Sequence, residues 1–397
     1  MSNPERTPPR IASITPAAMA DPRDVGGPRQ PLLRAQGLVK HFPLKRKGFN
    51  FRGPRPVVRA VDGVSFDIRK GETLGVVGES GCGKSTTARL LMQLTAQDHG
   101  ELIFDGEAVG EGAQTSGLPI REYRRQVQMV FQDSYASLNP RMTIEDSVAF
   151  GPMVHGVATR AALARAHDLL ARVGLEPARF AGRYPHELSG GQRQRVNIAR
   201  ALALEPRLVI LDEAVSALDK SVEAQVLNLL EDLKRDFGLT SLFIRHDLQV
   251  VRYVSDRVLV MYLGQVVEVG PSDQVFEAPR HPYTRALLQS MPSTDPLQRT
   301  TEAPLSGDPP NPIDPPPGCR FHTRCAFAQP VCRQQVPAFV EPAPGHGVAC
   351  LRWQPESGYE PMPDFPSMPP PVAASLRPLN AAVAIDMPDI FPEARRG

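Results

Sequence analysis

The chain has 397 residues, enough for two or three folded units at roughly 100 to 200 residues each. Hydrophobic residues make up 41% and charged residues 22%, a globular mix that excludes a fibrous, wholly disordered or membrane-embedded chain. The 45 basic and 43 acidic residues leave a formal charge of +2, too small for a protein that works mainly by neutralising a nucleic-acid backbone. We therefore expect no nucleic acid among its partners.

Hydropathy gives no sign of a membrane segment. No apolar run approaches the roughly 18 to 20 residues that cross a bilayer, and the N-terminus lacks the charged and then apolar pattern of a signal peptide. We therefore expect the chain to stay in the cytosol.

Proline marks the organisation of the chain. Of the 42 prolines, 10 lie in residues 1–56 and 21 in 301–397, and only 11 lie between. Proline without hydrophobic periodicity is typical of flexible segments, so both ends are predicted to be tails. The predicted parts are a tail at 1–30, a body at 31–275 with a helical insertion at about 141–188, an extension at 276–353 and a second tail at 354–397.

Short apolar runs alternate with helical patterns in the body. The runs are apolar on both faces, as in parallel strands that are covered by helices. They lie at Thr73–Val77, 128–131, 208–211 and 241–244. Between the last two, residues 221–237 carry one apolar helical stripe. The pattern predicts an α/β fold with a parallel sheet.

A glycine-rich segment follows the first of these runs and precedes a predicted helix. Backbone N–H groups of such a loop surround a β-phosphate at a helix N-terminus, while Lys84 reaches the β/γ oxygens and the Ser85 hydroxyl ligates Mg²⁺. In this context we interpret the segment as a P-loop. Its residues are Gly78, Glu79, Ser80, Gly81, Cys82, Gly83, Lys84, Ser85 and Thr86. Cys82 is expected to be an accessible thiol.

Two acidic residues, Asp212 and Glu213, directly follow the predicted strand at 208–211. Side chains alternate along a strand, so the two point to different places and can hold different roles. We assign Asp212 to the Mg²⁺ shell and Glu213 to polarising the attacking water.

A second helix start combines Ser189, a good N-cap, with Gly190 and Gly191. Adjacent glycines destabilise a helix, but they allow its N-terminus to approach an anion closely. Because one P-loop already surrounds most of a triphosphate, this helix is predicted to bind the nucleotide of another subunit.

These motifs resemble the ATP-binding subunits of ABC transporters. The matched elements, in that family's order, are the P-loop, Gln132, the signature Leu188-Ser189-Gly190-Gly191-Gln192, the pair Asp212-Glu213, the loop Ser216-Ala217-Leu218-Asp219, and His246. The segments 131–140 and 281–288 and the cysteine segment are similar to the oligopeptide/dipeptide importer branch. The resemblance spans about residues 32–353. It implies a P-loop ABC-type nucleotide-binding domain with an antiparallel β subdomain, a helical subdomain and a small C-terminal cysteine-rich module.

The resemblance also implies roles for single residues. Gln132 would contact Mg²⁺ and the water, His246 the γ-phosphate, and Asp219 the subunit interface. Phe42 is the candidate adenine platform, with a core aromatic as the alternative. Two departures are visible, because Arg245 stands where the family commonly has a small hydroxyl residue, and Ala214 where proline is frequent.

Four cysteines, Cys319, Cys325, Cys332 and Cys350, fall in a segment too rich in proline to build much core. In a reducing compartment such a cluster favours a metal over disulfides. The spacing is wider than in most zinc modules, and some members of the importer branch carry a four-iron cluster. A [4Fe-4S] cluster is therefore favoured, with zinc or free thiols as alternatives.

The implied function is ATP hydrolysis that powers import of a solute, most simply di- or oligopeptides. The implied partners are a second ABC ATPase subunit arranged head to tail, identical or related, two transmembrane permease subunits and, indirectly, an extracytoplasmic binding protein. The chain would then sit peripherally on the cytoplasmic face of the inner membrane. Glutathione and nickel importers would share these motifs. The alternative is a soluble ABC-type ATPase that acts on DNA or ribosomes.

Overall fold

The computed structural model describes Asp24, Gly27, residues 30–44, 55–110, 117–214, 220–290 and 307–363, and Phe365. Its N-terminal part contains a four-stranded antiparallel sheet with the order β2-β1-β4-β5. The strands are β1 (Leu33–Pro43), β2 (Val57–Ile68), β4 (His99–Phe104) and β5 (Glu107–Ala108). Leu33, Ala35 and Leu38 of β1 are buried, so one face of this sheet belongs to the core.

A second sheet of eight strands has the order β11-β12-β10-β9-β3-β8-β7-β6. Its strands are β3 (Thr73–Val77), β6 (Val127–Val130), β7 (Leu208–Asp212), β8 (Thr240–Ile244), β9 (Arg257–Tyr262), β10 (Gln265–Pro271), β11 (Val340–Ala343) and β12 (His346–Val348). The neighbouring strands β9, β3, β8, β7 and β6 pair in parallel. Strands β10, β12 and β11 continue the sheet beyond β9 with antiparallel pairs. The four buried strands that the sequence predicts are confirmed, with ends shifted by at most one residue.

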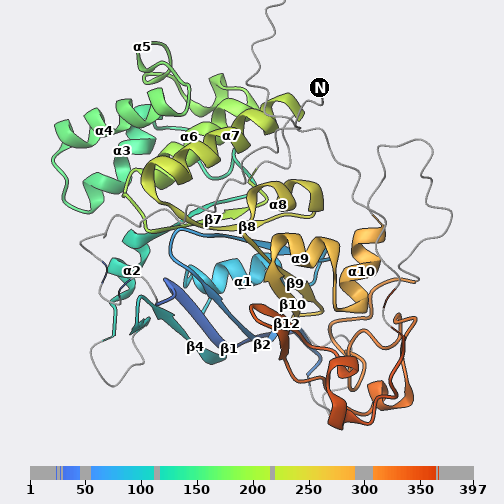
Figure 1. Cartoon of the computed structure of the whole chain (residues 1–397). Helices are drawn as coiled ribbons and strands as arrows, with labels where there is room; N and C mark the ends of the chain where they lie inside the picture. Colours follow the sequence, from blue (N-terminus) through green and yellow to red (C-terminus); the bar gives the residue numbers. More distant parts are fainter. Residues whose placement is uncertain are drawn as a thin grey trace, which may run out of the picture.

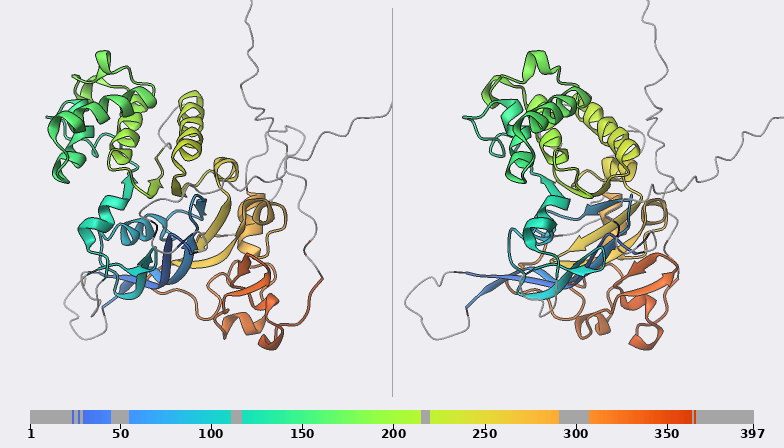
Figure 2. Two further views of the ribbon diagram at one scale, coloured as in Figure 1. Left: turned by 60° about the vertical axis from the view of Figure 1, so that its left-hand side comes forward. Right: turned by 90° about the vertical axis from the view of Figure 1, so that its left-hand side faces the viewer.

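The helices cover the large sheet and form a separate lobe (Figure 1). They are α1 (Lys84–Leu91), α2 (Ile120–Gln126), α3 (Ile144–Val154), α4 (Thr159–Arg172), α5 (Pro177–Phe180), α6 (Gly190–Leu202), α7 (Lys220–Phe237), α8 (Leu248–Val254), α9 (Ser272–Glu277) and α10 (Pro282–Gln289). In the described residues, 3₁₀ turns lie at Pro185–Glu187, Pro330–Arg333, Leu351–Trp353 and Pro355–Ser357. Both views of Figure 2 show α3, α4 and α5 at the end of the molecule away from the C-terminal module. Within the part of the chain that the structure describes, no helix combines the length and apolarity of a membrane span.

The hydrophobic core lies on both faces of the eight-stranded sheet. Along β7, Leu208 and Ile210 belong to the cluster shared with the antiparallel sheet, whereas Val209 and Leu211 belong to the cluster under the helical lobe. This alternation explains why residues 208–211 are all apolar.

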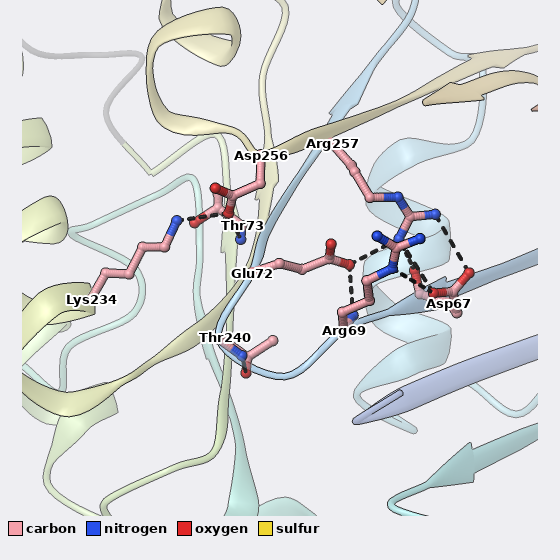
Figure 3. A network of polar contacts seen from close by, with 9 residues as sticks. Asp67, Arg69, Glu72, Thr73, Lys234, Thr240, Asp256 and Arg257 are labelled. Atoms are coloured by element: carbon pink, nitrogen blue, oxygen red, sulfur yellow. Dashed lines mark hydrogen bonds and ion pairs between the residues drawn. The ribbon is translucent and has the colours of Figure 1, made fainter. Parts of the chain in front are cut away.

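A network of ion pairs and hydrogen bonds lies at the amino ends of the parallel strands (Figure 3). The Arg257 guanidinium at the start of β9 contacts Glu72 at 3.0 Å and Asp67 at 3.3 Å. The backbone N–H of Thr73 donates to Asp256, which also pairs with Lys234 at 2.7 Å. The opposite, carboxyl edge of the sheet is the end at which ligands bind in open α/β folds.

Candidate nucleotide site

The P-loop connects the end of β3 to the start of α1. All five residues of β3 are buried, and the chain leaves the strand at Gly78 with a φ of 149°. A Cβ on Gly78 would lie 2.2 Å from the carbonyl oxygen of Met261, and one on Gly83 would lie 2.2 Å from that of Ala60. Only glycine fits at both positions, because the loop packs directly against the backbone of β9 and β2.

The Lys84 side chain points back across the loop. It is buried, and its Nζ donates to the carbonyl oxygens of Gly78 at 2.7 Å and Glu79 at 3.0 Å. A cation beside backbone N–H groups at a helix N-terminus is an arrangement that attracts phosphate. The predicted residues Ser80, Gly81, Cys82, Ser85 and Thr86 follow in the same loop and the first turn of α1.

Cys82 is buried, so the expectation of an accessible thiol is wrong. The loop turns its side chain inward, where Sγ lies 3.7 Å from Lys84 Nζ. Burial raises the pKa of this thiol, and the nearby Lys84 charge only partly opposes that rise.

Asp212 and Ser85 meet at the carboxyl edge of the sheet. The Ser85 hydroxyl at the start of α1 donates to Asp212 Oδ1 at 3.0 Å. Burial raises the pKa of Asp212, and the neighbouring Glu213 charge adds to the rise, while the Ser85 hydrogen bond opposes it. Mg²⁺ prefers oxygen ligands of this kind together with phosphate and water, so the pair fits the predicted magnesium site.

Glu213, Gln132 and His246 come together although they follow three different strands. Glu213 has a φ of 49°, and its N–H donates to the carbonyl oxygen of Ile244 at 3.0 Å. Its carboxylate accepts a hydrogen bond of 2.7 Å from Gln132 Nε2 and lies 3.9 Å from His246 Nδ1. The His246 side chain is 65% exposed, so the three residues face a space that a phosphate and a water can reach.

The signature residues lie at the start of α6. Ser189 accepts from the Gln192 N–H and Gln192 accepts from the Ser189 N–H, which confirms the predicted N-cap. A Cβ on Gly191 would lie 2.5 Å from Val222 of α7, whereas Gly190 has open space around it. Among the described residues, no hydrogen bond or ion pair joins these four positions to the P-loop.

Two further predicted site residues, Phe42 and Asp219, lie away from the positions described so far or outside the described residues. Phe42 lies near the end of β1, opposite Val58 of β2, and is 39% exposed, which contradicts the alternative of a core aromatic. Lys40 places its ammonium 5.7 Å from the ring centroid. Asp219 lies outside the described residues.

The four cysteines line one small cavity together with Phe321, His322 and Tyr359. Burial raises the pKa of Cys319 to about 11 and of Cys325 and Cys350 to about 12. Thiol groups that share a cavity are a donor set for zinc or an iron–sulfur cluster. In the part of the chain that is described, however, no three His, Cys, Asp or Glu side chains stand close enough to hold a metal ion without adjustment.

The C-terminal region reaches the P-loop through two residues that sequence reasoning missed. Arg324 forms two hydrogen bonds to the Glu79 carboxylate, at 2.7 and 3.0 Å, and the Tyr283 hydroxyl accepts from the Glu79 N–H at 2.8 Å. Neither contact has a local sequence signal, because the partners are 245 and 204 residues apart.

Two family models match separate parts of this chain. A family model described as ABC transporter matches residues 61–216, and one described as oligopeptide/dipeptide transporter, C-terminal region, matches residues 267–332. The oligopeptide transport ATP-binding protein AppF of Bacillus subtilis is 49% identical over 81% of this chain and 97% of its own. A probable peptide ABC transporter ATP-binding protein of Sinorhizobium fredii is 50% identical over 80% of this chain and 89% of its own.

Solved structures agree in fold. A dimeric structure of the ATP-binding cassette MJ0796 bound to ADP and Pi, in a post-hydrolysis state, has a TM-score of 0.52 at 27% identity, covering 60% of this chain and 98% of that one. The structure of cbiO1 from Clostridium perfringens, part of an ABC transporter complex, gives the same TM-score over 62% of this chain and 90% of that one.

Proposed function

The chain belongs to the ABC transporter ATPases, in the group that carries the oligopeptide/dipeptide C-terminal region, and from this we propose that it hydrolyses ATP to power the import of di- or oligopeptides. One observation carries the proposal: the nucleotide-binding motifs and the oligopeptide/dipeptide region occur in one chain that aligns with 97% of an oligopeptide transport ATP-binding protein. The same observation counts against a soluble ATPase that acts on DNA or ribosomes.

The geometry supports a division of roles within the site. The P-loop amides and Lys84 bind the phosphates, and Ser85 and Asp212 would hold Mg²⁺, which when bound neutralises phosphate charge. Glu213 accepts a proton from the attacking water, Gln132 orients the Glu213 carboxylate through its hydrogen bond, and His246 contacts the γ-phosphate. Phe42, exposed at the end of β1, stacks on the adenine.

Two chains assemble head to tail, so that Ser189, Gly190, Gly191 and Gln192 of one complete the nucleotide site of the other. Among the residues that the structure describes, no hydrogen bond or ion pair joins them to the P-loop of the same chain, which supports this arrangement, as does the dimer of the related cassette. Asp219 is assigned to the same interface. Two permease subunits hold the pair at the cytoplasmic face of the membrane, and an extracytoplasmic binding protein delivers the peptide.

The experiment is peptide uptake in a strain that lacks this subunit. The parent chain should restore uptake of a labelled tripeptide, and Glu213→Gln should not. Glu176→Gln, at an exposed position at the start of α5, is the matched control and should restore it. Uptake that is unchanged by deletion of the subunit would contradict peptide import, and copurification from detergent-solubilised membranes would then identify the true partners.

The four cysteines are proposed to hold a [4Fe-4S] cluster, with zinc as the competing occupant. Their shared cavity supports a common ligand, and small movements of the thiols must accompany its binding because the side chains are not yet arranged around a metal. Protein purified without oxygen should be brown and contain about four iron and about four acid-labile sulfide ions per chain, and both should be lost in Cys325→Ser. Colourless protein with stoichiometric zinc would reverse the assignment.

A further inference from the structure

Glu79 is the point at which the C-terminal extension touches the nucleotide site. Its carboxylate accepts one hydrogen bond from each terminal nitrogen of Arg324, and its backbone N–H donates to the Tyr283 hydroxyl. The Arg324 side chain is 5% exposed and that of Glu79 is 21% exposed, so water screens this pair only weakly. Bidentate contacts between arginine and a carboxylate fix geometry as well as contribute energy.

The backbone of Glu79 is also tied to the phosphate-binding lysine. Its carbonyl oxygen accepts from Lys84 Nζ at 3.0 Å. The residue is therefore held at three places: the N–H by Tyr283, the side chain by Arg324 and the carbonyl by Lys84. A shift of Glu79 would move the carbonyl that positions the lysine, and with it the amides that follow in the loop.

Arg324 itself is held firmly within the cysteine module. Its N–H donates to the carbonyl oxygen of Phe321 at 3.0 Å, and the Phe321 ring packs against Tyr262 and Tyr283 with centroids 5.3 and 5.4 Å apart. In the same turn, Arg320 binds Asp62 and the carbonyl oxygen of Leu263. The turn between Cys319 and Cys325 is thus fitted onto the nucleotide-binding domain.

We propose that Tyr283 and Arg324 are positioning residues for ATP, which hold Glu79 and the P-loop in the conformation that binds MgATP. The extension thereby sets the nucleotide affinity of the chain. The inference rests on the nucleotide site of the proposed function, but it is independent of the transported solute and of any metal at the cysteines.

The first measurement is the dissociation constant for MgATP of the full-length chain. Arg324→Gln and Glu79→Gln should each weaken binding by about tenfold, Arg324→Lys should recover part of the loss, and the double variant should be no weaker than either single one. Tyr283→Phe should weaken binding in the same direction. Arg333→Gln, at an exposed position of the same module, is the matched control and should bind like the parent.

The second measurement needs no nucleotide. Cys82 is buried by the folded P-loop, so loosening the loop should expose it. In Arg324→Gln, alkylation by N-ethylmaleimide should become faster at Cys82 than in the parent, as followed by mass spectrometry of its peptide, while the chain remains folded at the assay temperature.

Three outcomes would overturn the inference. One is an affinity within about twofold of the parent in Arg324→Gln. Another is an alkylation rate at Cys82 that does not change. The third is a loss of affinity that comes with a lower Tm and equal exposure of all five cysteines, because that result reports unfolding. Failure of the parent to bind MgATP would instead refute the proposed function, and the alkylation assay would still decide the positioning role.

Discussion

Arg245 and Glu223 form an ion pair in which each side chain is only 4% exposed. Arg245 follows β8 and directly precedes His246, and Glu223 lies in the first turn of α7. The pair thus joins the histidine of the nucleotide site to the helix that follows the Ser216-Asp219 segment. It also explains how an arginine fits where the family commonly has a small hydroxyl residue.

Glu223→Gln should destabilise the fold strongly, because it leaves the buried Arg245 guanidinium without its countercharge. Removing one partner of a buried pair typically costs about 3 to 5 kcal/mol, whereas replacing both by apolar residues is often close to neutral. Thermal unfolding should therefore show a large drop in Tm for Glu223→Gln and a small one for Arg245→Met/Glu223→Leu. Glu223 also pairs with Lys220 at 2.9 Å, so the substitution leaves two cations without their carboxylate, and similar Tm values for Glu223→Gln and the parent would contradict a stabilising role for the pair.

Glu213→Gln should slow hydrolysis by about 10²- to 10⁴-fold, because the amide cannot accept the proton of the attacking water. ATP binding should survive, since Lys84, Ser85 and the P-loop amides make the phosphate contacts, and the variant should accumulate as an ATP-loaded dimer in size-exclusion chromatography. Lys84→Ala should lose affinity and remain monomeric. A hydrolysis rate of Glu213→Gln within about threefold of the parent rate would mean that another group accepts the proton of the attacking water.

Gly190→Asp should fold normally and yet fail to hydrolyse ATP. Gly190 has open space around it, and an acidic residue at the first position of α6 suits the helix dipole. In a head-to-tail dimer the new carboxylate would face the partner's nucleotide, and repulsion should lower the ATPase rate by about tenfold or more. Gly190→Asn, of the same shape without the charge, is the control. Equal ATPase rates for the parent and Gly190→Asp would exclude the head-to-tail site.

His281 should make stability depend on pH. Its ring is fully buried and N-caps α10, accepting from the Tyr283 N–H at 3.0 Å, and burial lowers the pKa to about 4 despite the opposing charge of Glu268. Between about pH 6.5 and 4 the unfolded chain binds a proton that the folded chain does not, so stability falls as the pH falls, by up to about 3 kcal/mol. Above pH 6.5 this contribution is fully present.

Chemical denaturation of the parent and of His281→Asn at several pH values measures this effect. Asparagine retains a capping acceptor but does not titrate, so the slope of unfolding free energy against pH should be shallower in the variant. Parallel slopes would show that carboxyl groups alone cause the acid instability.

Local pattern was sufficient to predict four of the five described parallel strands of the large sheet, the P-loop and the capped start of α6. Each is specified by neighbours in the chain: a continuous apolar run for β3, a spacing of glycines before Lys84, and Ser189 followed by Gln192 three residues later. The inward turn of Cys82 could not be predicted in this way, because it depends on packing against the neighbouring strands.

Contacts between distant segments had no signal of their own. Arg245 stood out in the sequence as unusual, but nothing marked Glu223 as its partner, since any acid on the facing side of α7 would have served. Arg324 lay in a turn between two cysteines, and its partner is a residue of the P-loop whose identity that motif leaves free. Such pairs follow from how distant segments of the chain pack together, which no local pattern encodes.

The strand order of the large sheet has a consequence for how the chain can be divided. The C-terminal extension follows the nucleotide-binding domain along the sequence, but its strand β12 supplies the hydrogen-bonding partner of β10, with Glu268 opposite Val348 and Val269 opposite Gly347. A chain that stops after α10 would leave β10 as a bare edge, open to pairing with other chains. It would also remove His346, whose ring forms a hydrogen bond with the fully buried Glu268 carboxylate. The domain and its extension should therefore unfold together, in a single cooperative step.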